Sequence, residues 1–423
     1  MHFFNYRGNR FYAEGVPVER IAKEAGTPVF IYSQKTLKRH YRAFDGAFKG
    51  VRRLICYSVK ANSNLSVLKT FAKMGSGFDI VSRGELFRVL KAGGDPSKVV
   101  FSGVGKRDDE IEYGIRKNIL MFNVESAQEL RAIDSIAKRL KKRVCVAIRV
   151  NPGVNPKTHP YIATGFKKNK FGIEAKEALK EYVYAKENLK NLSLTGVDCH
   201  IGSQITEIAP FIDALKKTRN VVETLRREGL DIRYLNMGGG LGITYGDETP
   251  PHPSRYGKEV VMGTKGLDVT LIFEPGRNLA GNAGILVTKV LYTKKGTLKN
   301  FIVTDAAMND LPRPSLYGSY HAIKPVVMPG GKKEITADIV GPVCESGDFL
   351  ARDRDITEVK PGDLISVMSA GAYCFSMSSN YNSRPRAAEV MVLGRRFFVV
   401  REREVAEDLI KGEVLARPLF SGG

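Results

Sequence analysis

The sequence predicts an α/β protein that consists of a (β/α)8 TIM-like barrel and a mainly-β C-terminal domain. Short apolar runs alternate with amphipathic helical stretches from about residue 30 to residue 280. Eight such runs occur over about 250 residues, which is the size expected of a barrel of eight parallel strands. A doubly wound sheet is the structural alternative, but its usual glycine-rich loop does not follow the first run.

The eight predicted barrel strands are short apolar segments. They are residues 54–58, 78–81, 99–102, 119–124, 144–150, 194–200, 234–237 and 271–273. Helical periodicity lies between them, for example at 65–74, 85–92, 108–117, 126–140 and 208–228. In such a barrel the active face is formed by the carboxyl ends of the strands, so residues that follow the strands are the candidates for chemistry.

The pattern changes after about residue 281, where helical periodicity fades. Strand-like runs separated by proline and glycine turns follow at 285–292, 301–304, 335–340, 364–368, 388–392 and 397–401. The opening segment, with Phe3-Phe4 and Phe11-Tyr12, is expected to join these strands. We therefore predict a barrel domain at 30–280 and a β-rich domain formed by 1–29 and 281–423.

Composition and charge exclude several classes of protein. The 423 residues are 43% hydrophobic and 26% charged, as in ordinary globular proteins, and no apolar stretch has the length of a membrane span. The first residues lack the order of a signal peptide, so we expect a cytoplasmic protein without a membrane partner. A net charge of +21 raises the hypothesis of a nucleic-acid binder. Because basic and acidic residues are interspersed and no nucleic-acid motif accompanies them, a solvated surface is the favoured interpretation.

Five cysteines occur, at widely separated positions and never as a CxxC pair: Cys56, Cys145, Cys199, Cys344 and Cys374. This pattern argues against a disulfide framework and against a zinc site, and we expect no metal. The first three lie in apolar runs and are predicted to be core residues. Cys344 differs, because it lies in the polar, glycine-rich run 341–348.

Lys60 is the first residue that suggests chemistry. It directly follows the apolar run 54–59 and precedes a turn, Ala61-Asn62-Ser63-Asn64, that opens a helix. A lysine at the carboxyl end of a buried strand carries a costly charge, so its pKa can fall and its amine can become a nucleophile. For this segment alone, a lysine that caps a strand and points to water is the better interpretation.

Other polar residues at strand ends favour the functional interpretation. Asp79 lies in the second strand, and the later strands are followed by His200-Ile201-Gly202-Ser203, Gly238-Gly239-Gly240 and Glu274-Pro275-Gly276-Arg277. The triple glycine can bring backbone N–H groups against an anion, although a simple turn is the alternative. It is not a dinucleotide fingerprint, because Ile243 replaces the final glycine. A nucleophilic lysine with a phosphate site suggests pyridoxal 5′-phosphate, which also needs a partner for its ring nitrogen.

Several motifs closely resemble the diaminopimelate decarboxylase family, which belongs to the alanine racemase-like (fold type III) pyridoxal-phosphate enzymes. They are Tyr57-Ser58-Val59-Lys60-Ala61-Asn62, Cys199-His200-Ile201-Gly202-Ser203-Gln204, Glu274-Pro275-Gly276-Arg277, Met308-Asn309-Asp310-Leu311-Pro312-Arg313-Pro314, Cys344-Glu345-Ser346-Gly347-Asp348 and Gly371-Ala372-Tyr373. The resemblance extends from about residue 28 to 415 and keeps the motifs in order.

The resemblance implies a set of cofactor-binding residues. Lys60 would carry pyridoxal 5′-phosphate covalently, Glu274 would pair with the ring nitrogen, and His200 would stack on the ring. Gly240, the backbone of Gly276 and Arg277, and Tyr373 would hold the phosphate. Asp79, Ser203, Gly239 and Pro275 are expected to complete the site.

The resemblance also implies how a substrate is bound and which group donates a proton. The far end of the substrate would be gripped by Arg277, Arg313, Tyr317, Glu345 and Tyr373, with arginines for a carboxylate and Glu345 for an ammonium group. Cys344 would return a proton after CO2 leaves. Because the family's sites lie between two subunits, we expect a homodimer in which Cys344 acts in the partner's site. Taken singly, the arginines could be surface ion-pair residues and the tyrosines core residues.

The implied reaction is decarboxylation of meso-2,6-diaminopimelate to L-lysine and CO2, the last step of lysine biosynthesis. The nearest rival is an ornithine or arginine decarboxylase, whose substrates would leave the arginines without a distal carboxylate. A racemase would place a basic group where this chain has Glu274, and a pyridoxal-phosphate carrier would have no use for the β-rich domain. One departure is Asn169, which stands where the family usually has serine and could alter a loop over the site.

Overall fold

The computed structural model describes residues 2–156, 158, 170–330 and 333–416. The chain divides into two compact units, which are described separately. The barrel unit contains Ser33–Gly284 and Gly371–Ser376. The β unit contains Phe4–Tyr32, Ile285–Ala370 and the chain from Met377 onward. Asn169, the departure from the family pattern, lies outside the described residues.

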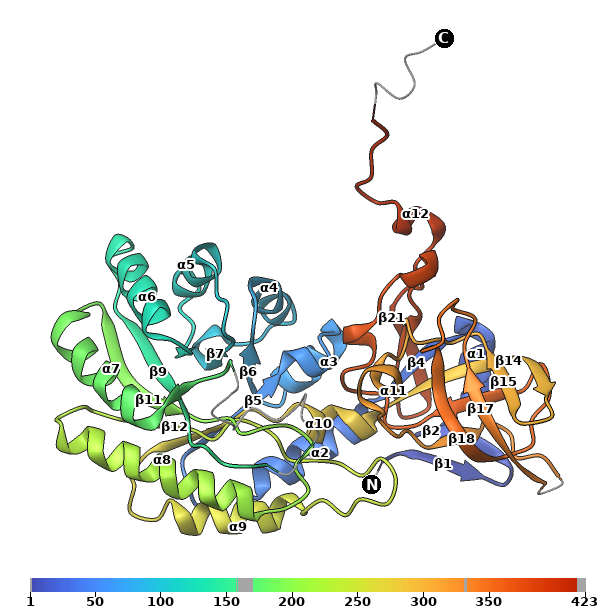
Figure 1. Ribbon diagram of the computed structural model, residues 1–423, viewed down its shortest axis with the longest axis horizontal. Coiled ribbons are helices and arrows are strands. Elements are labelled where there is room, and N and C mark those ends of the chain that lie inside the picture. Colours follow the sequence, from blue (N-terminus) through green and yellow to red (C-terminus); the bar gives the residue numbers. More distant parts are fainter. Residues whose placement is uncertain (1, 157, 159–169, 331–332, 417–423) are drawn as a thin grey trace. The chain divides into compact units, whose positions relative to one another are not determined.

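The barrel unit is a closed ring of eight parallel strands, as the sequence predicts (Figure 1). In ring order they are β9 (Val144–Asn151), β11 (Leu192–Asp198), β12 (Tyr234–Asn236), β13 (Thr270–Phe273), β5 (Arg53–Ser58), β6 (Gly77–Ile80), β7 (Val99–Phe101) and β8 (Met121–Val124). Pairing of β8 with β9 closes the ring, and β10 (Ile173–Glu174) adds to β9 outside it. All eight carboxyl ends therefore meet at one rim.

Helices follow the strands and surround the ring (Figure 1). They are α2 (Gln34–Gly46), α3 (Leu65–Ala72), α4 (Arg83–Lys91), α5 (Asp108–Arg116), α6 (Ala127–Arg139), α7 (Ala175–Asn188), α8 (Ala209–Arg227), α9 (Pro253–Gly263) and α10 (Arg277–Ala280). Serine caps start two of them close behind a strand: Ser82 Oγ accepts from Glu85 N, and Ser126 Oγ accepts from Glu129 N, each at 3.2 Å. Across the described ranges, no helix is both long and apolar enough to cross a membrane.

The interior of the ring is packed by side chains from several of its strands. A buried layer consists of Cys56, Val100, Met121, Ala147 and Ile272. Gly196 leaves the room that this layer needs, because a Cβ there would lie 2.8 Å from the sulfur of Met121. Cys56 and Cys199 are buried, and Cys145 packs against the layer, so these three cysteines are core residues as predicted.

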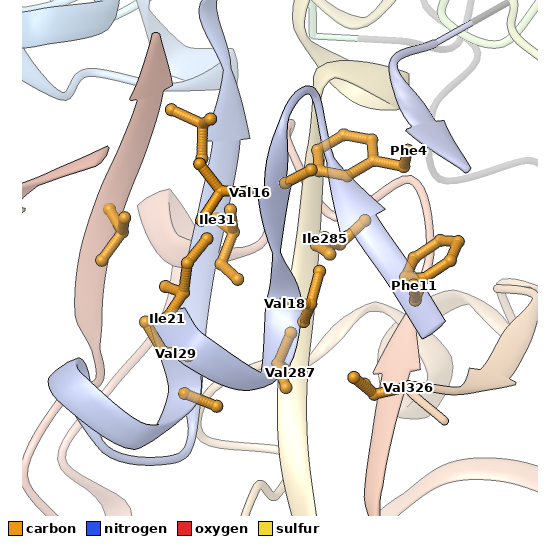
Figure 2. Packing of buried hydrophobic residues seen from close by; sticks show 14 of the residues in the cluster. Phe4, Phe11, Val16, Val18, Ile21, Val29, Ile31, Ile285, Val287 and Val326 are labelled. Atoms are coloured by element: carbon orange, nitrogen blue, oxygen red, sulfur yellow. The ribbon is translucent and has the colours of Figure 1, made fainter. Parts of the chain in front are cut away.

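The β unit is built on a nine-stranded sheet in which the N-terminal segment provides a central strand. Strand β4 (Val29–Ser33) lies between β14 (Gly284–Lys295) and β20 (Ala388–Leu393). Val29 and Ile31, two residues apart, share one face and pack with Ile285 and Val287 in the cluster of Figure 2. Phe4 and Phe11 of the opening segment belong to the same cluster, and Phe4–Tyr32 lies in the β unit with the later strands.

The remaining elements of the β unit surround this sheet. They are β1 (Phe4–Arg7), β2 (Arg10–Ala13), β3 (Val16–Pro17), α1 (Val18–Ala25), β15 (Asn300–Thr304), α11 (Arg313–Tyr317), β16 (Ile323–Pro325), β17 (Glu334–Val340), β18 (Phe349–Thr357), β19 (Leu364–Val367), β21 (Arg396–Arg401) and α12 (Ala406–Leu409). Strand β18 was not predicted, because its sequence carries four charged residues. It lies at one end of the sheet, where exposed charged side chains are tolerated.

Candidate active site

Five of the polar segments singled out in the sequence lie at the carboxyl rim of the barrel. Lys60 lies in a single 3-10 turn (Val59–Ala61) directly after β5, and Asp79 lies within β6. His200 follows β11 by two residues, the glycines 238–240 follow β12, and Glu274 follows β13. Parallel strands that close into a ring bring these positions together although they are up to 214 residues apart in sequence.

Lys60 forms an ion pair with Asp79. Lys60 Nζ donates to Asp79 Oδ2 at 2.6 Å, and Ser58 Oγ donates to the same oxygen at 2.5 Å. Asp79 is fully buried, whereas 39% of the Lys60 side chain remains exposed. Among the described residues, Asp79 Oδ1 is buried without a hydrogen-bond partner.

The charge of Lys60 differs from what its position in the sequence suggests. Burial favours the neutral amine, but the negative charge of Asp79 and the neighbouring Tyr373 outweigh burial and raise the pKa of Lys60. The sequence alone suggested that burial could lower this pKa, and the carboxylate at 2.6 Å reverses that direction. The amine must lose a proton before it can act as a nucleophile.

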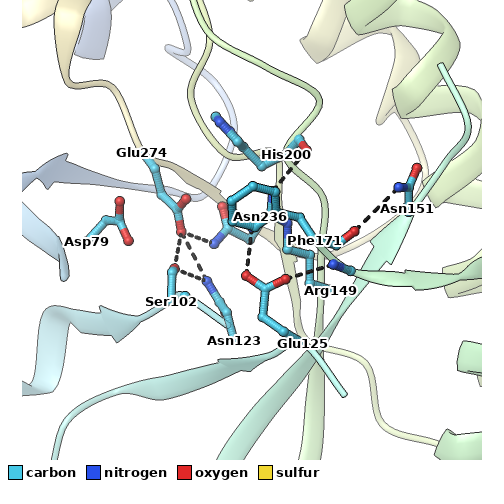
Figure 3. Close-up of polar contacts among 12 residues, drawn as sticks. Asp79, Ser102, Asn123, Glu125, Arg149, Asn151, Phe171, His200, Asn236 and Glu274 are labelled. Atoms are coloured by element: carbon cyan, nitrogen blue, oxygen red, sulfur yellow. Dashed lines mark hydrogen bonds and ion pairs between the residues drawn. The ribbon is translucent and has the colours of Figure 1, made fainter. Parts of the chain in front are cut away.

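Glu274 is a buried carboxyl group whose Oε1 is surrounded by donors. Asn236 Nδ2 donates to Oε1 at 2.5 Å, Asn123 Nδ2 at 3.0 Å and Ser102 Oγ at 3.5 Å. Figure 3 shows the three hydrogen bonds converging on this single oxygen. Burial, followed by the nearby Asp79 and Asp198, raises the pKa of Glu274 well above its usual range. A positive charge placed beside Glu274 would reverse this effect and favour the carboxylate.

Two further acids lie in the same interior. Glu125 pairs with Arg149 at 2.7 Å, and both side chains are almost completely buried. Burial raises the pKa of Asp198 to about 7, although the charge of Arg149 opposes this shift. Asp198 Oδ1 is buried without a partner among the described residues. Asp79, Glu125, Asp198 and Glu274 thus give the barrel interior more acidic groups than Lys60 and Arg149 can balance, and a cationic ring nitrogen would relieve this imbalance.

His200 is held as a neutral ring. Its Nδ1 accepts a hydrogen bond from Gly239 N at 3.1 Å, so Nδ1 carries no proton. Burial, together with the positive charges of Arg149 and Lys60, lowers the pKa of His200 well below its usual range. The remaining ring proton is therefore on Nε2, and the imidazole presents a flat, uncharged face.

The glycines of the rim are required by close backbone approach. A Cβ on Gly239 would lie 2.4 Å from the carbonyl oxygen of Glu274, and one on Gly240 would lie 2.6 Å from that of Gly202. Gly240 also has a φ of +109°, which other residues rarely adopt. At Gly276 a Cβ would meet Ala61 at 3.0 Å and the hydroxyl of Tyr373 at 3.1 Å. Only bare backbone fits at these places, and bare backbone can approach an anion closely, although the N–H of Gly239 is already bound to His200 Nδ1.

The segment Gly371–Ser376 carries Tyr373 onto the turn that holds Lys60. Tyr373 N donates to Ala61 O at 2.8 Å, and Asn62 Nδ2 donates to Gly371 O at 3.1 Å. Tyr373 has a φ of +58°, which is a strained value for a tyrosine. The surrounding contacts therefore hold this backbone in a conformation of higher energy. This segment belongs to the barrel unit, whereas the sequence prediction placed residues 281–423 together in the β-rich domain.

Arg277 is fixed beside these elements. Its Nη2 donates to Ser203 Oγ at 3.0 Å and its Nη1 donates to the hydroxyl of Tyr245 at 2.7 Å. Its guanidinium carbon lies 4.8 Å from the centroid of the Tyr373 ring. The structure therefore brings together Lys60, Asp79, His200, Ser203, Gly239, Gly240, Glu274, Pro275, Gly276, Arg277 and Tyr373 within the barrel unit.

Arg313, Tyr317, Cys344 and Glu345 lie in the β unit. Arg313 is buried, and its Nη1 donates to His321 Nε2 at 2.7 Å. Because arginine only donates, His321 Nε2 must accept, and His321 Nδ1 carries the proton and donates to Met368 O at 2.7 Å. This chain of bonds fixes the guanidinium. Arg313 is the first residue and Tyr317 the last residue of the five-residue helix α11.

Cys344 and Glu345 lie on an exposed loop that is tied down by Asp348. The carboxylate of Asp348 accepts from Val343 N and from Met308 N, both at 2.7 Å, and so joins this loop to the segment that leads to Arg313. Asn382 Oδ1 accepts from Cys344 N at 2.8 Å. Of the five cysteines, all of which lie in the described part of the chain, Cys344 alone is exposed. In the described residues, no group of three or more His, Cys, Asp or Glu side chains is placed to hold a metal ion.

Sequence reasoning missed the donors around Glu274 and the partner of Arg313. Asn236 had a signal, since Asn-x-Gly at a strand end is typical of a turn in which the asparagine side chain accepts from the glycine N–H. That bond is present, with Gly238 N donating to Asn236 Oδ1 at 2.9 Å. Asn123 had no local signal, because its partner Glu274 is 151 residues away. His321 lies eight residues after Arg313, but no motif marks it as the acceptor.

Comparisons with known proteins define the class of this barrel. Residues 34–281 match the family described as "Pyridoxal-dependent decarboxylase, pyridoxal binding domain". The chain is 52% identical over 411 residues to the diaminopimelate decarboxylase of Vibrio cholerae, covering 97% of this chain and 98% of the relative.

Solved structures agree with this match. That of diaminopimelate decarboxylase from Helicobacter pylori complexed with L-lysine has a TM-score of 0.90 at 43% identity and covers 93% of this chain and 98% of its own. That from M. jannaschii in co-complex with L-lysine has a TM-score of 0.94 at 37% identity and covers 99% of both chains. The chain belongs to the diaminopimelate decarboxylase family, and pyridoxal 5′-phosphate is its cofactor.

The residues at the rim fit this cofactor. Lys60 is paired with a buried carboxylate, and a second buried acid, Glu274, has a raised pKa that a cationic ring nitrogen beside it would lower. Bare backbone at Gly239, Gly240 and Gly276 provides a cradle in which a Cβ would collide. A lysine, an anion cradle and an acid for the ring nitrogen are the three groups that the cofactor requires.

Replacing Asp79 by asparagine should make Lys60 reactive at lower pH. The substitution removes the largest influence that raises the pKa of Lys60, while burial, which lowers it, remains. The unprotonated fraction at pH 8 then rises, so uptake of the cofactor by the apoprotein should become about tenfold faster or more. Stopped-flow absorbance between pH 6 and pH 10 measures this rate.

The matched control is Asp134→Asn on α6, where the carboxylate accepts from Asn191 N at 2.9 Å and is remote from the rim. This variant should keep the pH profile of the unmodified protein. A profile of Asp79→Asn that is unchanged, or moved to higher pH, would contradict the assigned pairing.

Proposed function

We propose that this chain decarboxylates meso-2,6-diaminopimelate to L-lysine and CO2. The observation that carries the proposal is the match over almost the whole chain to diaminopimelate decarboxylases, combined with a complete set of cofactor-binding groups at the rim. When bound, pyridoxal 5′-phosphate supplies an electron sink for the electron pair left on the substrate's α-carbon. Lys60 is the residue proposed to carry it.

The residues of the barrel unit orient the cofactor and keep it cationic. The Glu274 carboxylate would pair with the ring nitrogen and favour its protonated form, and the neutral His200 ring would lie against the cofactor. Gly240, the backbone of Gly276 and Arg277, and the Tyr373 hydroxyl bind the phosphate, with Ser203, Gly239 and Pro275 shaping the cradle. Asp79 holds the Lys60 proton, since its Oδ2 lies 2.6 Å from Nζ.

The distal end of the substrate is proposed to be bound by Arg277, Arg313, Tyr317, Glu345 and Tyr373. Diaminopimelate has a second amino-acid head, and its carboxylate requires a fixed cation while its ammonium requires an acid. Arg277 and Arg313 are buried and held by hydrogen bonds, so they are preorganised for a carboxylate. Binding energy at this distant head orients the bond that breaks.

Cys344 is proposed to return the proton to the α-carbon, and to do so in the site of the partner subunit of a homodimer. Its exposure on a loop anchored by Asp348 supports this role, because a thiol that serves a neighbouring chain must be accessible. A cytoplasmic location completes the proposal and remains a prediction of the sequence.

The test is CO2 release by the protein reconstituted with pyridoxal 5′-phosphate. Meso-diaminopimelate, L-ornithine and L-arginine are compared at equal concentrations, with the Lys60→Ala protein as background. We expect diaminopimelate to be preferred by at least about 10⁴-fold in kcat/KM, because a site built for a polar group rejects analogues that lack it. Faster turnover of ornithine or arginine would instead identify the alternative, a basic amino-acid decarboxylase of the same fold.

A further inference from the structure

We propose that Asn236 is a positioning residue that couples the glycine loop 238–240 to the carboxylate of Glu274 and favours the charged form of that carboxylate. The inference rests on the proposed function, because that function assigns Glu274 to the ring nitrogen and the glycine loop to the phosphate. Asn236 itself is assigned no contact with cofactor or substrate.

The side chain of Asn236 uses both of its polar ends. It is the last residue of β12 and is fully buried. Its Nδ2 donates to Glu274 Oε1 at 2.5 Å, while its Oδ1 accepts from Gly238 N at 2.9 Å. Glu274 N in turn donates to Gly238 O at 2.8 Å. One amide thus joins the start of the glycine loop to the acid, and a backbone bond closes the connection. Figure 3 shows the bond from Asn236 to Glu274.

The donors around Glu274 distinguish it from the neighbouring acids. Asn123 Nδ2 adds a second amide donor to the same Oε1, from β8 on another side of the ring. By contrast, Asp198 has a buried Oδ1 that no described residue contacts by a hydrogen bond, and Asp79 is held in its charged form by the ion pair with Lys60. Donors that point at a carboxylate favour its charged form. This arrangement opposes burial, which raises the pKa of Glu274 and would otherwise keep it protonated.

Asn236 could act only by stabilising the glycine turn, and a second asparagine with the same turn contact distinguishes this role from the proposed one. Asn151 ends β9, and its Oδ1 accepts from Gly153 N at 3.0 Å, which is the same turn geometry. Its Nδ2 donates to Phe171 O at 3.4 Å instead of to Glu274. Aspartate at either position keeps an oxygen that accepts from the glycine N–H, and it replaces the side-chain NH2 donor with a second oxygen.

The experiment compares Asn236→Asp with Asn151→Asp in the holoprotein. Two properties are measured: the dissociation constant of pyridoxal 5′-phosphate, and the ¹⁵N chemical shift of its labelled ring nitrogen, which reports protonation. For Asn236→Asp we expect the dissociation constant to rise about 10- to 100-fold, the value of a hydrogen bond to a charged group. We also expect the ¹⁵N signal to move toward the unprotonated position. Asn151→Asp should match the unmodified protein in both.

Unchanged values for Asn236→Asp would overturn the inference, and so would equal changes in both variants. If Asn236→Asp does not fold, Asn123→Ser replaces it, because this change removes a donor to the same oxygen and leaves the Gly238 turn intact. It should move the ¹⁵N signal in the same direction, and an unmoved signal would overturn the inference. The proposed function fails on a different result, namely no CO2 release from diaminopimelate by the unmodified holoprotein, so the two outcomes are distinguishable.

Discussion

Replacing Lys60 by alanine is expected to abolish decarboxylation and to remove the visible absorbance of the bound cofactor. Lys60 is proposed to carry the cofactor, and its amine is the cation paired with the buried Asp79 at the rim. Loss of the nucleophile should lower kcat by at least about 10⁴-fold, as removal of a covalent catalyst does in other enzymes. Absorbance spectra and CO2 release of the purified variant measure both effects.

A matched control is Lys69→Ala on α3, where the lysine is exposed nine residues further along the chain. This variant should keep the spectrum and the rate of the unmodified protein. Retention of the cofactor absorbance by Lys60→Ala would show that another lysine carries the cofactor, and the proposed site would then be wrong.

Replacing Cys344 by alanine is expected to slow product formation by about 10²- to 10⁴-fold while the cofactor remains bound. This range is the usual contribution of a positioned proton donor. Cys344 lies on the exposed loop of the β unit and is proposed to protonate the α-carbon. The rate of L-lysine formation and the cofactor spectrum, measured on the same sample, separate loss of proton transfer from loss of cofactor.

Two controls sharpen this prediction. Cys145→Ala changes a partly buried thiol within the barrel and should leave the rate unchanged. The Cys344→Ala and Lys60→Ala proteins are then mixed under conditions of subunit exchange. At equal amounts, half of the dimers contain one subunit of each variant, and one of the two sites in each such dimer combines an intact Lys60 with an intact Cys344. About a quarter of the activity should therefore be restored. Full activity of Cys344→Ala would remove the thiol from the mechanism, and failure of the mixture would show that the sites are not shared.

The barrel could be predicted because short-range patterns in the sequence specify its strands and helices. Each strand is a short apolar run, each helix has its own periodicity, and alternation of the two admits few architectures. The closing pair β8–β9 follows from the same rule, because neighbours in sequence are neighbours in the ring. The rim could be predicted for the same reason, since strand ends that carry Lys60, Glu274 and the glycines must meet there.

The electrostatics of the site could not be predicted in the same way. Whether the pKa of Lys60 rises or falls depends on the distance to Asp79, and this distance is set by the pairing of β5 with β6. The donors to Glu274 come from β8 and β12, on strands that have no sequence motif in common. A buried asparagine within an apolar run is visible in the sequence, but its partner is not.

In the β unit, the sequence indicated strands but not their order. Strand β15 pairs with β17 in parallel, while most other neighbours are antiparallel, and no local pattern indicates that choice. The bond between Arg313 and His321 spans eight residues, yet nothing in the sequence marks His321 as the acceptor. Such contacts depend on tertiary packing and require the structure.

Reduction of the reconstituted protein with borohydride, followed by proteolysis and mass spectrometry, tests the assignment of Lys60 most directly. Reduction fixes the cofactor to the lysine that carries it. We predict a single pyridoxyl-modified peptide that contains Tyr57, Lys60 and Asn62, with the added mass on Lys60. Modification of a different lysine, or no modified peptide at all, would contradict the proposed site.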